Sequence, residues 1–358
     1  MTAEDFMRLA LAEAEKGRGR THPNPAVGAL VVRSGRVIAR GHHERAGLPH
    51  AEVNALRRAG ERARGADVYV SLEPCNHQGR TPACTEALIA AGVRRVYFGS
   101  RDPNPLVRGH GAGRLRRAGI QVRPGVLQTE CDASNEPWFK FITTGIPWVV
   151  LKAAVTLDGK LAPRRGVRQW ISSEPSRRLV HRWRNELDAV LVGAGTVRAD
   201  DPSLTVRGVA KGRNPLRVVL GKVPRRARLL RQPGETLAEE GPLRSVLRRL
   251  ARRGITSVLV EGGARVYGQF LASGLWDELR LFVVPKIFGP LALSWVDGVR
   301  GAIEDLEVRS VERVGADALL IVRPASGARR GPGARRRAPR NGAPARSGTR
   351  ARGAPIAR

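Results

Sequence analysis

Three potential metal ligands, His50, Cys75 and Cys84, constrain the fold of this chain more than any other feature of its sequence. One imidazole and two thiolates can occupy three corners of a tetrahedral zinc site and leave the fourth corner for water. The ligands come from separate segments, so the chain between them has to fold until all three meet. Glu52 follows the histidine by two residues and is placed to carry protons to and from that water without binding the metal.

The predicted metal site has two parts, His50 with Glu52 and Cys75 with Cys84, and each part falls where a helix is expected to begin. A helix should follow His50 and end near Gly60. Residues i and i+2 do not share a face of a regular helix, so His50 and Glu52 can converge only where the chain enters it. Thr81-Pro82 is typical of a helix start and places Cys84 in the first turn, where free N–H groups favour a thiolate.

Strands and helices alternate through residues 1–146, which predicts a three-layer α/β/α domain. Thr2 is expected to cap a helix over residues 3–16. The predicted strands that follow cover residues 27–32, 36–40, 67–72 and 95–99.

Residues 147–323 predict a second α/β domain. It begins with an apolar, β-prone segment over residues 148–155. A later strand runs into Glu261-Gly262-Gly263 and then into a helix, an arrangement that can bind an anion. Gly193-Ala194-Gly195 is only a partial dinucleotide fingerprint, because Arg198 replaces the third glycine.

The net charge of +31 invites a nucleic-acid interpretation, but its distribution argues against a selected binding face. Only 7 of the 63 basic residues are lysine, an arginine bias that is typical of GC-rich genomes. Residues 324–358 carry ten arginines, no acidic residue and no apolar periodicity, which predicts a disordered tail. We therefore expect no specific nucleic-acid partner.

The cysteine count and the apolar segments indicate a cytoplasmic, soluble protein. Three cysteines are too few and too odd in number for a disulfide framework. The first residues predict an amphipathic helix instead of a signal peptide. No apolar stretch approaches the roughly 18–20 residues of a membrane span. Cys131 has no ligand partner nearby in the sequence, so we expect it to be dispensable.

Motifs in both predicted domains carry a family resemblance. In the first they are Thr21-His22-Pro23-Asn24-Pro25, Pro49-His50-Ala51-Glu52, Leu72-Glu73-Pro74-Cys75, Gly79-Arg80-Thr81-Pro82 and Asp102-Pro103-Asn104-Pro105. In the second they are Leu157-Asp158-Gly159, Gln169-Trp170-Ile171, Asp200-Asp201-Pro202, Leu204-Thr205, Arg207 and Val260-Glu261-Gly262-Gly263. With these motifs, residues 2–323 resemble the bifunctional riboflavin-biosynthesis deaminase/reductase family.

The cysteine spacing supports this resemblance. The common signature of zinc-dependent base deaminases has two residues between its cysteines. Eight residues separate Cys75 from Cys84, a spacing that agrees with the riboflavin family.

The resemblance implies a cytidine-deaminase-like N-terminal domain and a dihydrofolate-reductase-like C-terminal domain. The first would bind Zn²⁺ through His50, Cys75 and Cys84, with Glu52 as the catalytic acid/base. It would deaminate a pyrimidine ribosyl phosphate, 2,5-diamino-6-(5-phosphoribosylamino)pyrimidin-4(3H)-one. The second would use NADPH to reduce the ribosyl group to ribityl, and the chain would form a homo-oligomer.

The resemblance also implies which residues bind the small molecules. Arg184 and Arg207 would suit the ribose phosphate as bidentate donors, and Lys152, Asp200 and Glu261 are candidates for proton handling. The deaminase substrate would contact Asn24, His42, His77 and Arg80. NADPH would lie near Ala154, Trp170, Thr196, Asp200 and Gly263, and the reductase substrate near Arg168, Arg184, Leu204, Arg207 and Glu261.

Two departures from the family pattern bear on the reductase. Gly221-Lys222 stands where an acidic or hydroxyl residue is usual, and the segment from Val223 to Leu243 is shortened, which predicts the loss of at least one strand. One alternative is therefore a deaminase with a degenerate second domain. Another is a nucleic-acid base deaminase, which would need a groove for the flanking nucleotides and would leave residues 147–323 without a purpose.

Overall fold

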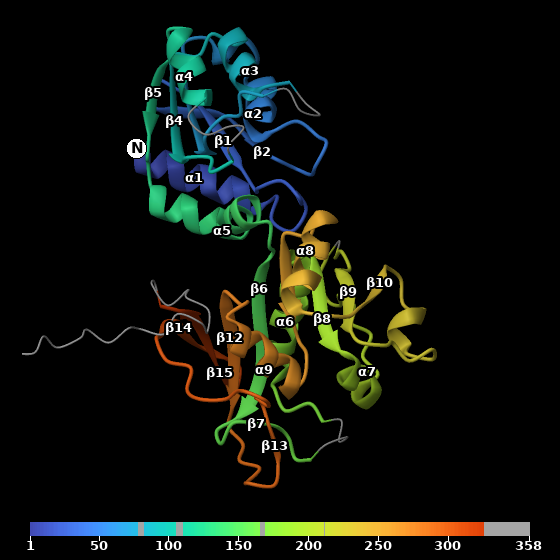
Figure 1. Ribbon diagram of the computed structural model, residues 1–358. Coiled ribbons are helices and arrows are strands. Elements are labelled where there is room, and N and C mark those ends of the chain that lie inside the picture. The colour runs from blue at the N-terminus through green and yellow to red at the C-terminus, as the bar shows by residue number, and fades with distance from the viewer. Residues whose placement is uncertain (78–81, 105–109, 165–168, 211, 326–358) are drawn as a thin grey trace, which may run out of the picture.

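The computed structural model describes residues 1–77, 82–104, 110–164, 169–210 and 212–325. Within this part the chain forms two units, each built on its own large sheet and stacked end to end (Figure 1). The first unit comprises the elements α1 to α5, and the second comprises β6 to β15. Only Gly145, Ile146 and Pro147 separate the end of α5 from the start of β6.

The sheet of the first unit has five strands in the order β2-β1-β3-β4-β5. Strand β1 pairs antiparallel with β2 and β3, whereas β3, β4 and β5 run parallel. Parallel strands need helical crossovers, which explains the alternation in the sequence. The bounds are β1 (Gly28–Arg33), β2 (Arg36–His42), β3 (Asp67–Leu72), β4 (Arg95–Ser100) and β5 (Gln121–Pro124).

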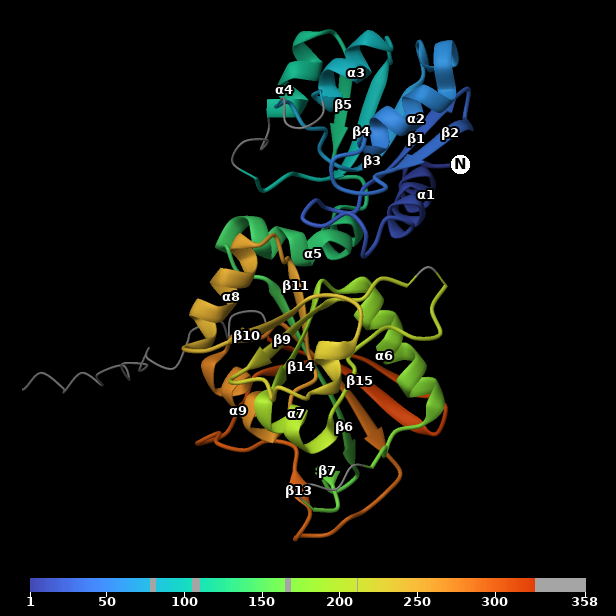
Figure 2. The ribbon, with the colours of Figure 1, turned by 90° about the vertical axis from the view of Figure 1, so that its right-hand side faces the viewer.

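Helices cover both faces of this sheet, so the predicted three-layer fold is confirmed (Figure 2). On one face lie α1 (Ala3–Glu15) and α5 (Gln128–Thr144), and on the other lie α2 (Ala51–Ala59), α3 (Cys84–Ala90) and α4 (His110–Arg117), with a 3₁₀ turn, η1, over Gly60–Ala63. Thr2 caps α1 as expected, in a reciprocal capping box with Asp5.

The second unit is built on an eight-stranded sheet in the order β10-β9-β8-β11-β6-β12-β15-β14. The strands from β10 to β12 are parallel, and β15 and β14 complete the sheet antiparallel. The bounds are β6 (Trp148–Thr156), β8 (Ala189–Gly193), β9 (Leu216–Leu220), β10 (Thr236–Glu239), β11 (Ser257–Val260), β12 (Glu278–Val284), β14 (Leu306–Val314) and β15 (Asp317–Pro324), with a small ribbon of β7 (Lys160–Ala162) and β13 (Leu293–Ser294).

Alternate residues of the central strands pack against helices on opposite faces of this sheet. Val149 and Leu151 of β6 face α8 (Leu243–Arg252) and α9 (Ala264–Ser273). Trp148 and Val150 face α6 (Glu174–Glu186), and α7 (Ala194–Asp200) packs farther along the same face. Both faces of the parallel strands are therefore buried, as such sheets require.

The shortened segment after β9 forms one edge strand, β10, and it also contains the 3₁₀ turn η2 (Arg228–Arg231). The loss of a strand relative to the family stays a prediction. The fully buried Arg217 of β9 holds this segment in place. Its guanidinium donates to the carbonyl oxygens of Pro233 and Gly234 and to Thr236 Oγ1. The guanidinium is buried with its donors satisfied by these oxygens, and it therefore ties the segment to β9.

Several polar contacts fasten the two units together. His22 Nδ1 lies 3.0 Å from Asp188 Oδ2, and Arg323 bridges Glu136 of α5 and Glu278 of β12. Lys140 of α5 pairs with Asp277. Both views place the end of α8 beside the first unit (Figures 1 and 2). Within the described residues, no helix is long and apolar enough to cross a membrane.

Candidate active sites

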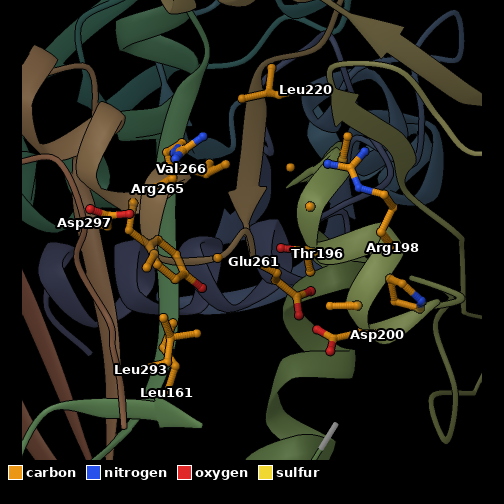
Figure 3. A pocket seen from close by; sticks show the side chains of 18 of the residues that line it. Leu161, Thr196, Arg198, Asp200, Leu220, Glu261, Arg265, Val266, Leu293 and Asp297 are labelled. Carbon is orange, nitrogen blue, oxygen red and sulfur yellow. The ribbon is translucent and has the colours of Figure 1, made fainter. Parts of the chain in front are cut away.

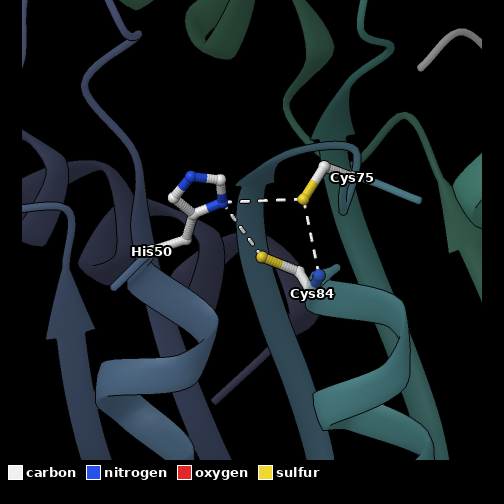
Figure 4. A group of neighbouring side chains, drawn as sticks. All are labelled: His50, Cys75 and Cys84. Carbon is white, nitrogen blue, oxygen red and sulfur yellow. Dashed lines mark hydrogen bonds between the residues drawn. The ribbon is translucent and has the colours of Figure 1, made fainter. Parts of the chain in front are cut away.

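The three predicted metal ligands meet at one point of the first unit (Figure 4). His50 is the N-cap of α2, Cys75 lies in the loop after β3, and Cys84 is the first residue of α3. The helix predicted from Thr81-Pro82 thus begins at Cys84. The backbone N–H of Cys84 donates to Cys75 Sγ at 3.4 Å, so a helix start stabilises that sulfur as a thiolate.

The donor set fits a zinc ion. His50 Nδ1 lies 3.1 Å from Cys84 Sγ and 3.6 Å from Cys75 Sγ. Tetrahedral zinc with ordinary Zn–N and Zn–S bonds separates neighbouring N and S ligand atoms by about 3.5 Å. The hydrogen bond from the Cys84 thiol, followed by that from His50, lowers the pKa of Cys75. Thiolates with an imidazole are ligands that zinc prefers over the alkaline-earth cations.

Glu52 lies next to this site but is not part of the ligand cluster. It sits in the first turn of α2 with only 3% of its surface exposed. Burial raises the pKa of its carboxyl, against the opposing charge of His50. A carboxyl that lies beside the ligands without belonging to them is placed to act as a general acid/base.

A cavity of about 530 Å³ opens above the ligands, and we call it the metal pocket. Asn24 and His77 line it as predicted. Asp102 and Asn104 also line it, although the sequence had offered them only as part of a motif. Burial raises the pKa of Asp102 to about 7. Trp138, Phe141 and Ile142 of α5 supply an apolar wall.

The structure corrects the prediction for His42. This residue ends β2 and points its Nδ1 toward Glu13 at 3.7 Å, away from the metal pocket. The next residue, His43, lines the pocket instead and contacts Asn24 Nδ2 through Nε2 at 3.1 Å. Successive side chains of an extended segment point to opposite sides. When one of two neighbouring histidines faces the pocket, the other therefore faces the core. Arg80, also predicted here, lies outside the described residues.

The second unit contributes to the metal pocket, which the sequence did not predict. Ala251 and Arg252, at the end of α8, and Gly254 beyond it all line this cavity. They approach the loop that carries Asn24. Contacts between segments more than two hundred residues apart leave no signal in local periodicity.

A second cavity, of about 910 Å³, lies at the carboxyl ends of β6, β8 and β11, and we call it the glycine-loop pocket (Figure 3). Crevices at this edge of a parallel sheet are the usual ligand sites of α/β folds. Gly263 is the N-cap of α9, and a Cβ there would lie 2.9 Å from Thr196 Oγ1. All five residues predicted to lie near NADPH line the pocket, namely Ala154, Trp170, Thr196, Asp200 and Gly263, and so does Glu261, one of the five predicted for the substrate.

Charged groups form a connected cluster at the inner end of the glycine-loop pocket. Glu261 accepts two hydrogen bonds from Arg184, one to each carboxylate oxygen. Burial opposes ionisation of Glu261, but Arg184 and Lys152 outweigh it and lower its pKa. Lys152 lines the pocket, and burial lowers its pKa. A lysine of lowered pKa next to a carboxylate can give up a proton more readily than a solvated one.

Three residues predicted to contact the reductase substrate do not line the glycine-loop pocket. Arg184 is engaged by Glu261 and by the carbonyl oxygen of Thr205. Leu204 is 3% exposed and packs in the core beside α7. Arg207 is exposed on the loop that follows, where its backbone N–H donates to His181 Nδ1. Arg168 lies outside the described residues.

Arginines that the sequence did not single out as ligands line the same pocket. Arg198 and Arg265 are both exposed, one on α7 and one on α9. Arg198 is the residue that replaces the third glycine of the dinucleotide fingerprint. The departure from the fingerprint therefore falls on a residue that lines the pocket. Trp170 is 61% exposed, and its ring lies against the guanidinium of Arg177, so it is not part of the core.

Family models match both units. One described as the cytidine and deoxycytidylate deaminase zinc-binding region covers residues 1–100, and one described as the RibD C-terminal domain covers residues 147–320. The riboflavin biosynthesis protein RibD of Aquifex aeolicus is 44% identical over 347 residues, which span 89% of this chain and 97% of that protein. Its Escherichia coli counterpart is 39% identical over 362 residues, spanning 89% and 99%.

Solved structures agree with this similarity. Acinetobacter baumannii RibD, form 1, superimposes with a TM-score of 0.87 at 36% identity and covers 90% of this chain and 99% of that one. A diaminohydroxyphosphoribosylaminopyrimidine deaminase/5-amino-6-(5-phosphoribosylamino)uracil reductase from Thermotoga maritima gives 0.84 at 40% identity, with coverage of 90% and 99%. These similarities extend across both units.

Proposed function

The chain belongs to the RibD family of riboflavin biosynthesis proteins, and we propose that its two pockets divide the two steps of this bifunctional enzyme. The enzyme is a zinc-dependent deaminase and an NADPH-dependent reductase. We assign deamination to the metal pocket of the first unit, the deaminase domain (residues 1–146). Reduction is assigned to the glycine-loop pocket of the second unit, the reductase domain (residues 147–323).

In the metal pocket, His50, Cys75 and Cys84 would hold the zinc ion. When bound there, zinc makes water a competent nucleophile near neutral pH. Glu52 takes a proton as oxygen adds to the amine-bearing ring carbon of 2,5-diamino-6-(5-phosphoribosylamino)pyrimidin-4(3H)-one. It returns protons to the ring nitrogen and to the departing amine, so that the C–N bond breaks and ammonia leaves. Asn24, His43 and His77 would hold the pyrimidine in place.

In the glycine-loop pocket, NADPH would supply hydride to the ribose carbon that carries the amine. Gly263 and Thr196 would meet the pyrophosphate, since a helix start behind a glycine turn presents free N–H groups to an anion. Ala154, Trp170 and Asp200 would border the rest of the cofactor. Hydride addition at this carbon requires its bond to the ring oxygen to break, and Lys152 would deliver the proton that this oxygen takes as the ring opens to ribityl.

The observation that carries this proposal is the convergence of three ligands beside a cavity that a non-ligand carboxyl, Glu52, also lines. The test is a coupled assay on the purified chain, in which mass spectrometry detects both successive products. We expect loss of one amine from the substrate, followed by a gain of two hydrogens only when NADPH is present. Absence of the first product would refute the assignment of the metal pocket.

A degenerate reductase domain is the alternative that the shortened segment once suggested. The edge strand β10 and the lining of the glycine-loop pocket by all five residues predicted for the cofactor favour a working cofactor site instead. Calorimetric titration separates the two. Binding of NADPH in the micromolar range supports a reductase, and no heat at millimolar NADPH would leave only a scaffold.

The chain is also proposed to act as a cytoplasmic homo-oligomer without a specific nucleic-acid partner. Its three cysteines are free thiols, as a reducing compartment allows. The edge strand β14 exposes Leu306, Val308 and Val311, apolar side chains that a second copy could cover. Size-exclusion chromatography with light-scattering detection measures the molar mass of the assembly. Gel shifts with tRNA at physiological salt test the nucleic-acid expectation.

A further inference from the structure

The metal pocket is bordered by a segment of the reductase domain that runs alongside the Thr21–Pro25 loop. His22 contacts Thr256 Oγ1 at 2.8 Å and Asp188 Oδ2 at 3.0 Å. Two positions before Thr256, a Cβ built on Gly254 would lie 3.7 Å from Pro23 Cβ. Two positions earlier still, Arg252 lines the pocket that Asn24 lines from the other side. The contacts fix where α8 ends, and therefore where Arg252 is presented.

Arg252 differs from the arginines beside it. Arg249 pairs with Glu239, and Arg253 pairs with Glu235. Arg252 is exposed, and no hydrogen bond or ion pair joins its side chain to any residue in the described part of the chain. An arginine that is held at a pocket wall without a partner is free to meet an anion.

The distribution of charge in the pocket indicates which part of a ligand that anion would be. The carboxyls of Glu52, Glu73 and Asp102 line the wall near the metal ligands. Among the described lining residues, Arg252 is the one lysine or arginine. A dianionic group would be repelled by the carboxylates and attracted by the guanidinium, so it should lie at the α8 side of the cavity.

We propose that Arg252 of the reductase domain binds the 5′-phosphate of the substrate during deamination. The deaminase site is then completed by the other domain, and its preference for phosphorylated substrate depends on a residue that carries no part of the deaminase chemistry. This inference rests on the proposed deaminase function of the metal pocket.

The test compares Arg252→Gln with Arg253→Gln in the full-length, zinc-loaded chain. Both variants remove one guanidinium from adjacent positions, but only Arg252 lines the pocket. Deamination is measured with the 5′-phosphorylated substrate and with its dephosphorylated form. We expect Arg252→Gln to raise KM for the phosphorylated substrate about 10- to 100-fold, as for the loss of one charge-assisted contact. Its kcat, and its KM for the dephosphorylated form, should match those of Arg253→Gln.

Arg252→Lys should recover part of the lost affinity, because a lysine keeps the charge but not the fork of donors. NADPH-dependent reduction of supplied deaminated substrate reports that the fold is intact in each variant. Equal kinetics of Arg252→Gln and Arg253→Gln would overturn the proposal and leave the phosphate to Arg80. An equal loss with both substrates would overturn it too, because it would indicate a structural role. Failure of the unaltered chain to deaminate would instead refute the proposed function itself.

Discussion

The metal pocket and the glycine-loop pocket were both predicted from the sequence, but the predicted residues come together more completely in the first than in the second. Every predicted metal ligand converges within hydrogen-bonding distance of another, and Glu52 lies beside them. In the glycine-loop pocket the residues next to the backbone turns line the cavity, whereas Arg184, Leu204 and Arg207 do not.

The difference follows from the range of the interactions. A metal site needs a few particular side chains at bond length, so residue type and local helix starts almost specify it. A cavity for a large anionic cofactor is shaped by strand ends, glycine turns and long charged side chains, and each of these side chains can pair with more than one neighbouring group. Arg184 illustrates this, because its guanidinium is already paired with the carboxylate of Glu261 and is not available to a phosphate. Arginine identity alone therefore does not locate a phosphate site.

Removing a metal ligand should abolish one activity and spare the other. Cys84→Ala is expected to lose its zinc and all measurable deamination, because two ligands cannot hold the ion against solution chelators. Reduction of supplied deaminated substrate should continue, since the glycine-loop pocket contains none of the ligands. Metal analysis and both assays are run beside Cys131→Ala, which removes a buried thiol far from the cluster and should keep zinc. Undiminished zinc in Cys84→Ala would mean that the ligand set is misassigned.

Glu52→Gln should separate chemistry from metal binding within the same pocket. The amide cannot accept or return a proton, so deamination should fall by at least about 10²-fold while zinc content stays the same. Glu44→Gln, a change to a half-exposed carboxylate outside the pocket, is the matched control. Loss of zinc in Glu52→Gln would show that the carboxyl supports the ligands and is not the acid/base.

Arg207→Ala tests whether an arginine outside the cavity lining still serves the reductase. If it contacts the ribose phosphate, KM for reduction should rise roughly 10- to 100-fold with little change in kcat, as for one charge-assisted contact of about 1.5–3 kcal/mol. Arg182→Ala, an exposed arginine of α6 that does not line the pocket, should be neutral. Identical kinetics for the two variants would place the phosphate with Arg198 or Arg265 instead.

Deleting residues 326–358 should have the least effect on both pockets. The deletion leaves β15 and its contact between Ala325 and Asp305 intact. The segment removed has no apolar periodicity and carries no acidic residue, so we expect both turnover numbers to change by no more than a few-fold. Steady-state kinetics and a thermal melt check this. A collapse of either activity would show that the tail takes part in folding or binding.

Much of the architecture was predictable because local rules agreed with the final packing. Thr2 caps α1 as expected, and Asp5 completes a reciprocal capping box with it. The turn at Glu261-Gly262-Gly263 leads from β11 into α9 as its residues indicated. The short connection after β9 was not predicted by local rules: Arg217 donates to its carbonyl oxygens, and β10 pairs with β9.

The sequence by itself determined the metal site, the two α/β units and the family, since each depends on residue types at short spacings. Only the tertiary structure decided that His43 and not His42 faces the metal pocket, because strand register sets which neighbour points inward. Only it brought the end of α8, with Ala251, Arg252 and Gly254, to a pocket whose remaining lining residues precede them by more than one hundred positions. Contacts of this range are selected by the burial and pairing of whole elements, a property that no single segment carries.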